Sequence, residues 1–205
     1  MGPATVEPTA QDPSRPGHLR TRRVRDRPSS EDELGQWPRL SHAAARSLTH
    51  NAEGTTLLAM ATLEDAIALA VETHRGQKDK AGEPYILHPL RVMLRLAWDA
   101  PEAAKIAAVL HDVVEDSDGK VTVADLGRLG YAQEAIDAVE LLSRRPSDTY
   151  EQFIERLLPN PIARMVKRAD LEDNMDVRRI PAVGERERER LARYRAAWSR
   201  VVQAG

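Results

Sequence analysis

The chain has 205 residues, a formal net charge of −2 at pH 7 and no cysteine, so it is long enough for one ordinary domain with a buried core. The near-neutral charge does not favour a polyanionic partner such as nucleic acid, and without cysteine any metal must be held by nitrogen and oxygen ligands. No apolar run has the length of a transmembrane helix, and the N-terminus lacks the apolar stretch of a secretory signal, so we expect a cytoplasmic protein with no membrane partner.

Residues 1–57 differ in composition from the rest of the chain. They are rich in proline, arginine and acids and poor in apolar residues, so they cannot offset the entropy lost on ordering, and we expect a disordered tail. A basic cluster in this tail could contact nucleic acid or anionic lipid, but a solvated tail is favoured because no aromatic residue is interleaved for stacking. The cluster consists of Arg20, Arg22, Arg23, Arg25 and Arg27. Met60, just before the first periodic segment, is a candidate for the true first residue.

From about residue 58 onward, apolar residues recur at the spacing of helices. Leu63, Ile67 and Ala70 share one face of a first helix, and the polar, two-glycine stretch 76–84 predicts a loop. Pro89 and Pro101 each suit the first turn of a helix, which predicts helices over 89–98 and 101–116.

The C-terminal half continues the helical pattern. Thr122 can cap a helix through residue 129, and another helix is expected over 133–143. An apolar stripe follows over 150–158, and Asn160 with Pro161 begins a helix towards Asn174. The last helix carries an apolar stripe over 191–202. No segment alternates as a strand would, so the predicted fold class is all-α, with a helical bundle at 58–205 behind the tail at 1–57.

The run His-Asp-Val-Val-Glu-Asp at 111–116 is the most informative segment for chemistry. In an unbroken helix His111 faces Glu115, and Asp112 faces Asp116. Burying so many acids beside the apolar stretch 106–110 is costly unless a cation or protons neutralise them. A divalent metal would do this, and a charged helix end exposed to water is the alternative.

A second acidic position lies far along the chain. Asp170 falls on the apolar side of its expected helix, and Asn174 lies one turn further on the same face. A carboxylate on an inward face needs a partner, and a metal shared with residues 111–112 would supply one. The alternatives are a salt bridge with a neighbouring base such as Lys167, and a plain helix C-cap for Asn174.

Two histidines of the helical region remain. His88 stands where an extended chain enters a helix, between apolar residues; alone it would more often be a core residue, but the metal-type groups on two other helices favour a ligand. His74 has the weaker claim, and we expect it to hold the loop 76–84 by a hydrogen bond.

Together these residues predict metal-activated hydrolysis of a phosphorylated substrate. Two imidazoles and two carboxylates leave positions open for water and substrate, which suits Mn²⁺ or a similar divalent cation. Glu115 and Asp116 are candidates to orient the water or move its proton, and Lys78 and Lys80 are candidates to bind substrate phosphates. A glycine-rich phosphate loop is absent, which argues against an NTPase. The expected ligands are His88, His111, Asp112 and Asp170.

Three motifs in order carry a resemblance to a known family: Gly-Glu-Pro-Tyr-Ile-Leu-His-Pro-Leu at 82–90, Leu-His-Asp-Val-Val-Glu-Asp at 110–116, and Val-Lys-Arg-Ala-Asp at 166–170 followed by Asn174. With them the chain resembles the HD-domain hydrolases of the RelA/SpoT type, which remove pyrophosphate from the 3′ position of guanosine tetra- and pentaphosphate. The resemblance spans about residues 63–174 and is to small stand-alone hydrolases.

This resemblance implies an all-helical bundle with bound Mn²⁺ and a small-molecule nucleotide substrate. It also implies a role for each matched residue. Glu115 and Asp116 would assist the attacking water, and Asn174 would help to place the substrate. The implied metal ligands are His88, His111, Asp112 and Asp170.

One position departs from the family. Its guanosine-specific members place an arginine before the lysine, where this chain has Asp79 before Lys80, and an aspartate cannot pack on guanine as that arginine does. The first substrate to test is therefore guanosine tetraphosphate, and the alternatives are another nucleotide, a cofactor such as NADPH, or a module that only senses nucleotides. The pair Glu115 and Asp116 speaks against a sensor, since mere binding gives it no role. The amphipathic last helix leaves a homo-oligomer open.

Overall fold

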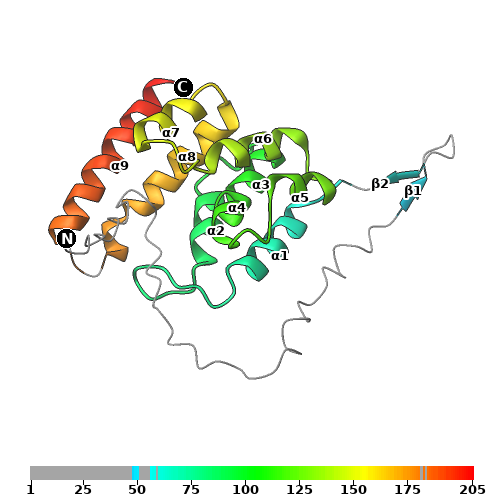
Figure 1. Cartoon of the computed structure of the whole chain (residues 1–205), viewed down its shortest axis with the longest axis horizontal. Coiled ribbons are helices and arrows are strands. Elements are labelled where there is room, and N and C mark those ends of the chain that lie inside the picture. Colours follow the sequence, from blue (N-terminus) through cyan, green and yellow to red (C-terminus); the bar gives the residue numbers. More distant parts are fainter. Residues whose placement is uncertain (1–47, 51–55, 59, 181, 183) are drawn as a thin grey trace, which may run out of the picture.

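Most of the described chain beyond residue 60 is helical, and the helices follow one another in the order that the apolar periodicity predicts (Figure 1). The computed structural model describes residues 48–50, 56–58, 60–180, 182 and 184–205. The helices are α1 Leu63–Thr73, α2 Leu87–Leu94, α3 Glu102–Leu110, α4 Val113–Asp116, α5 Val123–Arg128, α6 Gln133–Leu142, α7 Tyr150–Leu157, α8 Pro161–Asn174 and α9 Glu185–Gln203, with a 3₁₀ turn, η2, at Val177–Arg179. The predicted all-α class is confirmed.

Helix α3 lies at the centre of the core. It packs against α1, α2, α6 and α8, and its residues Ala107, Ala108, Val109 and Leu110 are buried. Its small alanine side chains let the neighbouring helices approach closely. Helix α9 packs along α8, with α7 beside it (Figure 1). Because α2, α3 and α8 all contact one another, the three sequence motifs meet in one place.

Two predicted helix starts are confirmed by their caps. The Thr122 hydroxyl accepts from the Asp125 amide at 3.2 Å, and the Asp125 carboxylate accepts from the Thr122 amide at 2.9 Å, which forms a capping box at α5. At α8 the Asn160 side chain accepts from the Ala163 amide at 2.9 Å, with Pro161 in the first turn. In both cases a side chain satisfies an amide that the helix itself leaves unpaired.

The predicted helix over 89–98 is wrong at both ends, since α2 spans Leu87–Leu94. It begins earlier because the Pro84 and Tyr85 carbonyls already accept from the Leu87 and His88 amides, at 3.1 and 2.8 Å. Pro89 therefore lies in the first turn, where a missing amide costs little.

The prediction of one continuous helix over 101–116 is also wrong, because the helix breaks at His111 and Asp112. Asp112 has φ −102° and ψ −8°, away from α-helical values. One physical reason is local: His111 Nδ1 bonds to the Ala108 carbonyl at 2.8 Å, the oxygen that the Asp112 amide would take in an unbroken helix. The two residues therefore form a corner between α3 and α4.

A short antiparallel pair of strands, β1 Leu48–His50 and β2 Thr56–Leu58, lies at the end of the segment 1–57 expected to be disordered and extends one residue beyond it. Each strand contains a threonine, a β-branched residue that favours extended backbone. The rest of the predicted tail, including the basic cluster of residues 20–27, lies outside the described residues, and the domain boundary at residue 58 stays a prediction. Within the described ranges, none of the helices combines the length and apolar character needed to span a membrane.

Candidate metal centre

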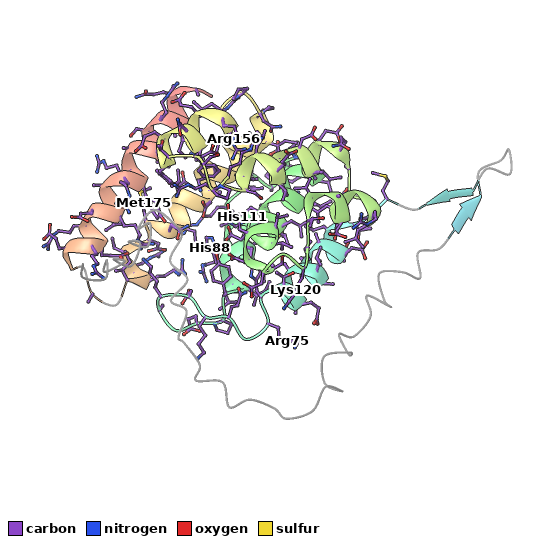
Figure 2. The ribbon with its side chains drawn as sticks, in the orientation of Figure 1. Arg75, His88, His111, Lys120, Arg156 and Met175 are labelled. Carbon is purple, nitrogen blue, oxygen red and sulfur yellow. The ribbon has the colours of Figure 1, made fainter. Side chains whose placement is uncertain are left out.

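His88 and His111 lie next to each other in the middle of the helical region (Figure 2), with ring centroids 5.2 Å apart. Both are buried, and each ring is held through Nδ1: His111 donates to the Ala108 carbonyl and His88 to the Asp173 carboxylate, both at 2.8 Å. Because a carbonyl only accepts, His111 carries a proton on Nδ1, so Nε2 is the nitrogen that can bind a metal when the ring is neutral. Among the described residues, neither Nε2 atom has a hydrogen-bond partner.

Two carboxylates face these nitrogen atoms. Asp112 Oδ2 lies 3.1 Å from His111 Nε2 and 3.7 Å from His88 Nε2. From α8, Asp170 Oδ1 lies 3.2 Å from His88 Nε2 and 3.8 Å from His111 Nε2. The ligand atoms of His88, His111 and Asp112 all lie within 4.8 Å of one another. Two buried imidazole nitrogens without hydrogen-bond partners, beside two carboxylates, form a donor set that fits a divalent cation.

Each carboxylate is also held by side chains other than the histidines. The Tyr85 hydroxyl donates to Asp112 Oδ2 at 2.5 Å. Lys167 Nζ lies 2.8 Å from Asp170 Oδ2, and Asn174 donates to Asp170 Oδ1 at 2.6 Å. The sequence left open whether Asp170 forms a salt bridge with Lys167 or faces a metal site. In the structure Asp170 both pairs with Lys167 and lies close to the two histidines. Asn174 turns inward and holds Asp170.

Charges in this cluster shift the pKa values of its members strongly. Burial by itself lowers the pKa of His111, but the charges of Asp112 and Asp170 outweigh it and raise that pKa to about 9. Burial would raise the pKa of Asp112, yet the neighbouring His111 and His88 hold it well below its usual range. Burial would also raise the pKa of Asp170, but Lys167 and His88 outweigh it and hold that pKa below its usual range. The two carboxylates are therefore ionised at neutral pH, as metal ligands must be.

Asp173 belongs to the site and was missed by the sequence reasoning. Its side chain is fully buried and accepts from His88 Nδ1 at 2.8 Å and from Arg91 Nε at 3.0 Å. Arg95 and Arg179 also bond to this carboxylate. One signal was available: Asp173 lies three residues after Asp170, so the two share neighbouring faces of α8. Tyr85, three residues before His88, was missed as a contact of Asp112.

Glu115 and Asp116 lie in α4, directly beyond the histidine–aspartate corner, and both are half-buried. Glu115 Oε1 accepts from the Arg144 backbone amide, and burial raises the pKa of Glu115 above its usual value. Glu115 also lines a cavity of about 20 Å³ together with residues that include His111, Asp112 and Asp170. Such a cavity has room for a water molecule. Both acidic and basic side chains line it.

The three residues expected to bind substrate have different surroundings in the structure. Asn174 contacts Asp170, as described above. Lys80 Nζ pairs with Glu187 Oε2 of α9 at 3.3 Å, and Lys78 is exposed, with its backbone bridged to Pro84. The expected role of His74 is confirmed, since its Nδ1 lies 2.8 Å from Oε1 of Gln77 in the loop.

Comparisons with known proteins point to one family by sequence. No family model matches the chain. A guanosine-3′,5′-bis(diphosphate) 3′-pyrophosphohydrolase of Aquifex aeolicus is 30% identical over 140 residues, which cover 64% of this chain and 19% of that protein. A GTP pyrophosphokinase of Streptomyces coelicolor is 33% identical over 122 residues, which cover 55% and 14%. The chain thus spans about a fifth or less of the length of these curated relatives.

A solved structure agrees with the sequence comparisons. It is described as a metazoan ortholog of SpoT that hydrolyzes ppGpp; it is 25% identical, has a TM-score of 0.57, and the match covers 73% of this chain and 88% of that one. In sequence and in fold, the comparisons therefore confirm that this chain is similar to the RelA/SpoT-type hydrolases, as its three motifs predict.

Proposed function

We propose that this protein is a metal-dependent phosphohydrolase that removes the 3′-pyrophosphate from guanosine tetraphosphate or pentaphosphate. The observation that carries the proposal is the pair of buried His Nε2 atoms without hydrogen-bond partners, facing two ionised carboxylates. Relatives named as 3′-pyrophosphohydrolases support the reaction type, as does the solved ortholog that hydrolyzes ppGpp.

In this proposal the cation, with Mn²⁺ as the first choice, is held by four residues of α2, the α3–α4 corner and α8. When bound, it supplies the positive charge that polarises a phosphoryl oxygen and lowers the pKa of water. The Nδ1 contacts of the two histidines would fix their rings so that Nε2 is the nitrogen offered to the cation. Tyr85, Lys167 and Asn174 orient the carboxylates. The proposed ligands are His88, His111, Asp112 and Asp170.

The remaining chemistry falls to the acids of α4. Water attacks the phosphorus next to the ribose 3′ oxygen and the bond to that oxygen breaks. The 3′ oxygen takes up a proton and leaves as the ribose hydroxyl, and the two phosphates are released as pyrophosphate. Glu115 lines the cavity beside the ligands, and its raised pKa suits a carboxylate that accepts the proton of this water. Asp116, its neighbour in α4, would orient the water or pass the proton on.

A second substrate class is favoured by one position. The Asp79 side chain is 7% exposed and paired with Arg179, so it is not available to pack on a guanine base. Another nucleotide, or a nucleotide cofactor such as NADPH, therefore remains the second candidate substrate for the same site.

A substrate panel tests the proposal. The full chain, stripped of metal with EDTA and reloaded with Mn²⁺, would be incubated with guanosine tetraphosphate, other nucleotides and NADPH while released phosphate and pyrophosphate are followed. We expect pyrophosphate from guanosine tetraphosphate only when Mn²⁺ is present. Turnover of NADPH alone would establish the second candidate, and metal binding without turnover of any substrate would indicate a sensor.

Replacing Glu115 with glutamine should separate chemistry from binding. The amide keeps the size of the side chain but cannot accept a proton, so we expect kcat to fall by about 10²–10⁴-fold while Mn²⁺ affinity stays near that of the wild type. Single-turnover kinetics and Mn²⁺ titration measure the two quantities. Glu134→Gln, at an exposed position of α6, is the control. An unchanged kcat in Glu115→Gln would remove this residue from the mechanism.

A further inference from the structure

The loop at residues 76–84 is tied to the rest of the domain through Asp79. One oxygen, Oδ1, accepts from the backbone amides of Ala81 and Glu83 at 2.9 and 3.0 Å, which closes the loop on itself. The other oxygen, Oδ2, accepts from Arg179 Nη2 at 2.5 Å. Asp79 is thus a buried structural carboxylate that joins the loop to η2, a hundred residues further along the chain.

Arg179 continues this connection towards the metal centre. Its Nη1 donates to Asp173 Oδ2 at 2.5 Å and to the Asp173 carbonyl at 3.2 Å. Asp173 Oδ2 is the same oxygen that accepts from His88 Nδ1 at 2.8 Å. The planar guanidinium of Arg179 therefore bridges two carboxylates: that of Asp79 in the loop, and that of Asp173, which is bonded to His88.

We propose that Asp79 and Arg179 are positioning residues that act through Asp173 on His88, so that the loop at 76–84 and the metal-binding imidazole are coupled. This inference rests on the metal site of the proposed function. Asp79 holds the Arg179 fork in place, the fork holds the Asp173 carboxylate, and that carboxylate sets the orientation of the His88 ring. Partners of this kind orient metal-binding histidines and influence metal affinity.

A second bridge limits the size of the effect. Arg91 also reaches both carboxylates, with Nε 3.0 Å from Asp173 Oδ1 and Nη2 3.7 Å from Asp79 Oδ2. The contact of Arg91 with Asp79 is longer than that of Arg179 with Asp79. Arg91 therefore still pairs with Asp173 when Arg179 is removed, but it does not bridge the two carboxylates as closely as Arg179 does. Removing Arg179 should therefore loosen His88 without releasing it.

The test is a Mn²⁺ titration of the full chain by calorimetry after removal of metal with EDTA. Arg179→Gln should weaken Mn²⁺ binding by about tenfold, and Asp79→Asn should weaken it by a similar factor. Because both act through the same contact, the double variant should be no weaker than the weaker single variant. Arg178→Gln is the matched control, since Arg178 is the neighbouring arginine, is 82% exposed and pairs with Asp176 instead; it should bind Mn²⁺ within twofold of the wild type.

Two results would overturn the coupling: single variants that bind Mn²⁺ as the wild type does, or losses that multiply in the double variant. Thermal unfolding in EDTA accompanies each titration, and Arg179→Lys replaces Arg179→Gln if the latter does not fold; the lysine keeps the charge but not the fork, so weakened binding is again expected. The titration needs no turnover, so an inactive wild type that binds Mn²⁺ would contradict the proposed function and leave the coupling intact. A wild type that binds no Mn²⁺ would overturn both.

Discussion

Asp112→Ala is expected to abolish metal-dependent hydrolysis, with a loss of about a thousandfold or more in kcat/KM, which corresponds to roughly 4 kcal/mol. The Asp112 carboxylate lies close to both imidazole nitrogens, 3.1 Å from His111 and 3.7 Å from His88. Without it, the remaining groups hold a cation with one ligand and one charge fewer. Initial rates with guanosine tetraphosphate over a range of Mn²⁺ concentrations measure the loss.

The control for this variant is Asp137→Ala, which removes an exposed aspartate of α6. We expect it to keep full activity and the Mn²⁺ dependence of the wild type. Full activity of Asp112→Ala at every Mn²⁺ concentration would refute the metal site, because the cation would then act without one of its four proposed ligands.

Asp173→Ala should produce the largest loss of stability, about 3–5 kcal/mol in the free energy of unfolding. This buried carboxylate accepts from His88, Arg91, Arg95 and Arg179, and its removal leaves the imidazole and three arginines without their shared acceptor. Asp173→Asn keeps the shape and loses the charge, so a smaller loss is expected. Urea unfolding of the full chain in EDTA measures both.

The stability difference between the wild type and the Asp173 variants should depend on pH. Burial raises the pKa of Asp173, but the bonds from His88 and Arg91 outweigh it and hold that pKa below its usual range. A carboxylate with a lowered pKa stabilises the fold at pH values above about 4, and this contribution is lost as the pH falls towards the folded-state pKa. The difference between wild type and Asp173→Asn should therefore shrink in acid. A difference below about 1 kcal/mol at neutral pH would show that the arginines find other partners.

The sequence and the structure assign different roles to Asp79. In the sequence it is a departure from the guanosine-specific members of the family, and it directs attention to the base of the substrate. In the structure it is a paired carboxylate beneath Arg179 and Arg91. An arginine at this position would face two others, so Asp79→Arg is expected to disrupt the loop before it reports on substrate choice.

Local patterns were sufficient for most helices and for the residue types of the site. Apolar spacing, Thr122 at a cap, and Asn160 before Pro161 all act within a few residues, so the sequence alone predicts where these helices begin. The same spacing predicts that Asp170 faces inward. These features depend on neighbours three or four residues apart, which any helix brings together.

Tertiary packing decided the rest. The bend at His111 and Asp112 is an exception, because its cause is local: the His111 side chain takes a carbonyl from its own helix. Packing determined that Asp173 accepts from His88 and that Asp79 pairs with Arg179. These contacts join residues that are 85 and 100 positions apart. Periodicity identifies the face that a helix buries but not the helix that it meets, and that choice depends on how the whole core packs.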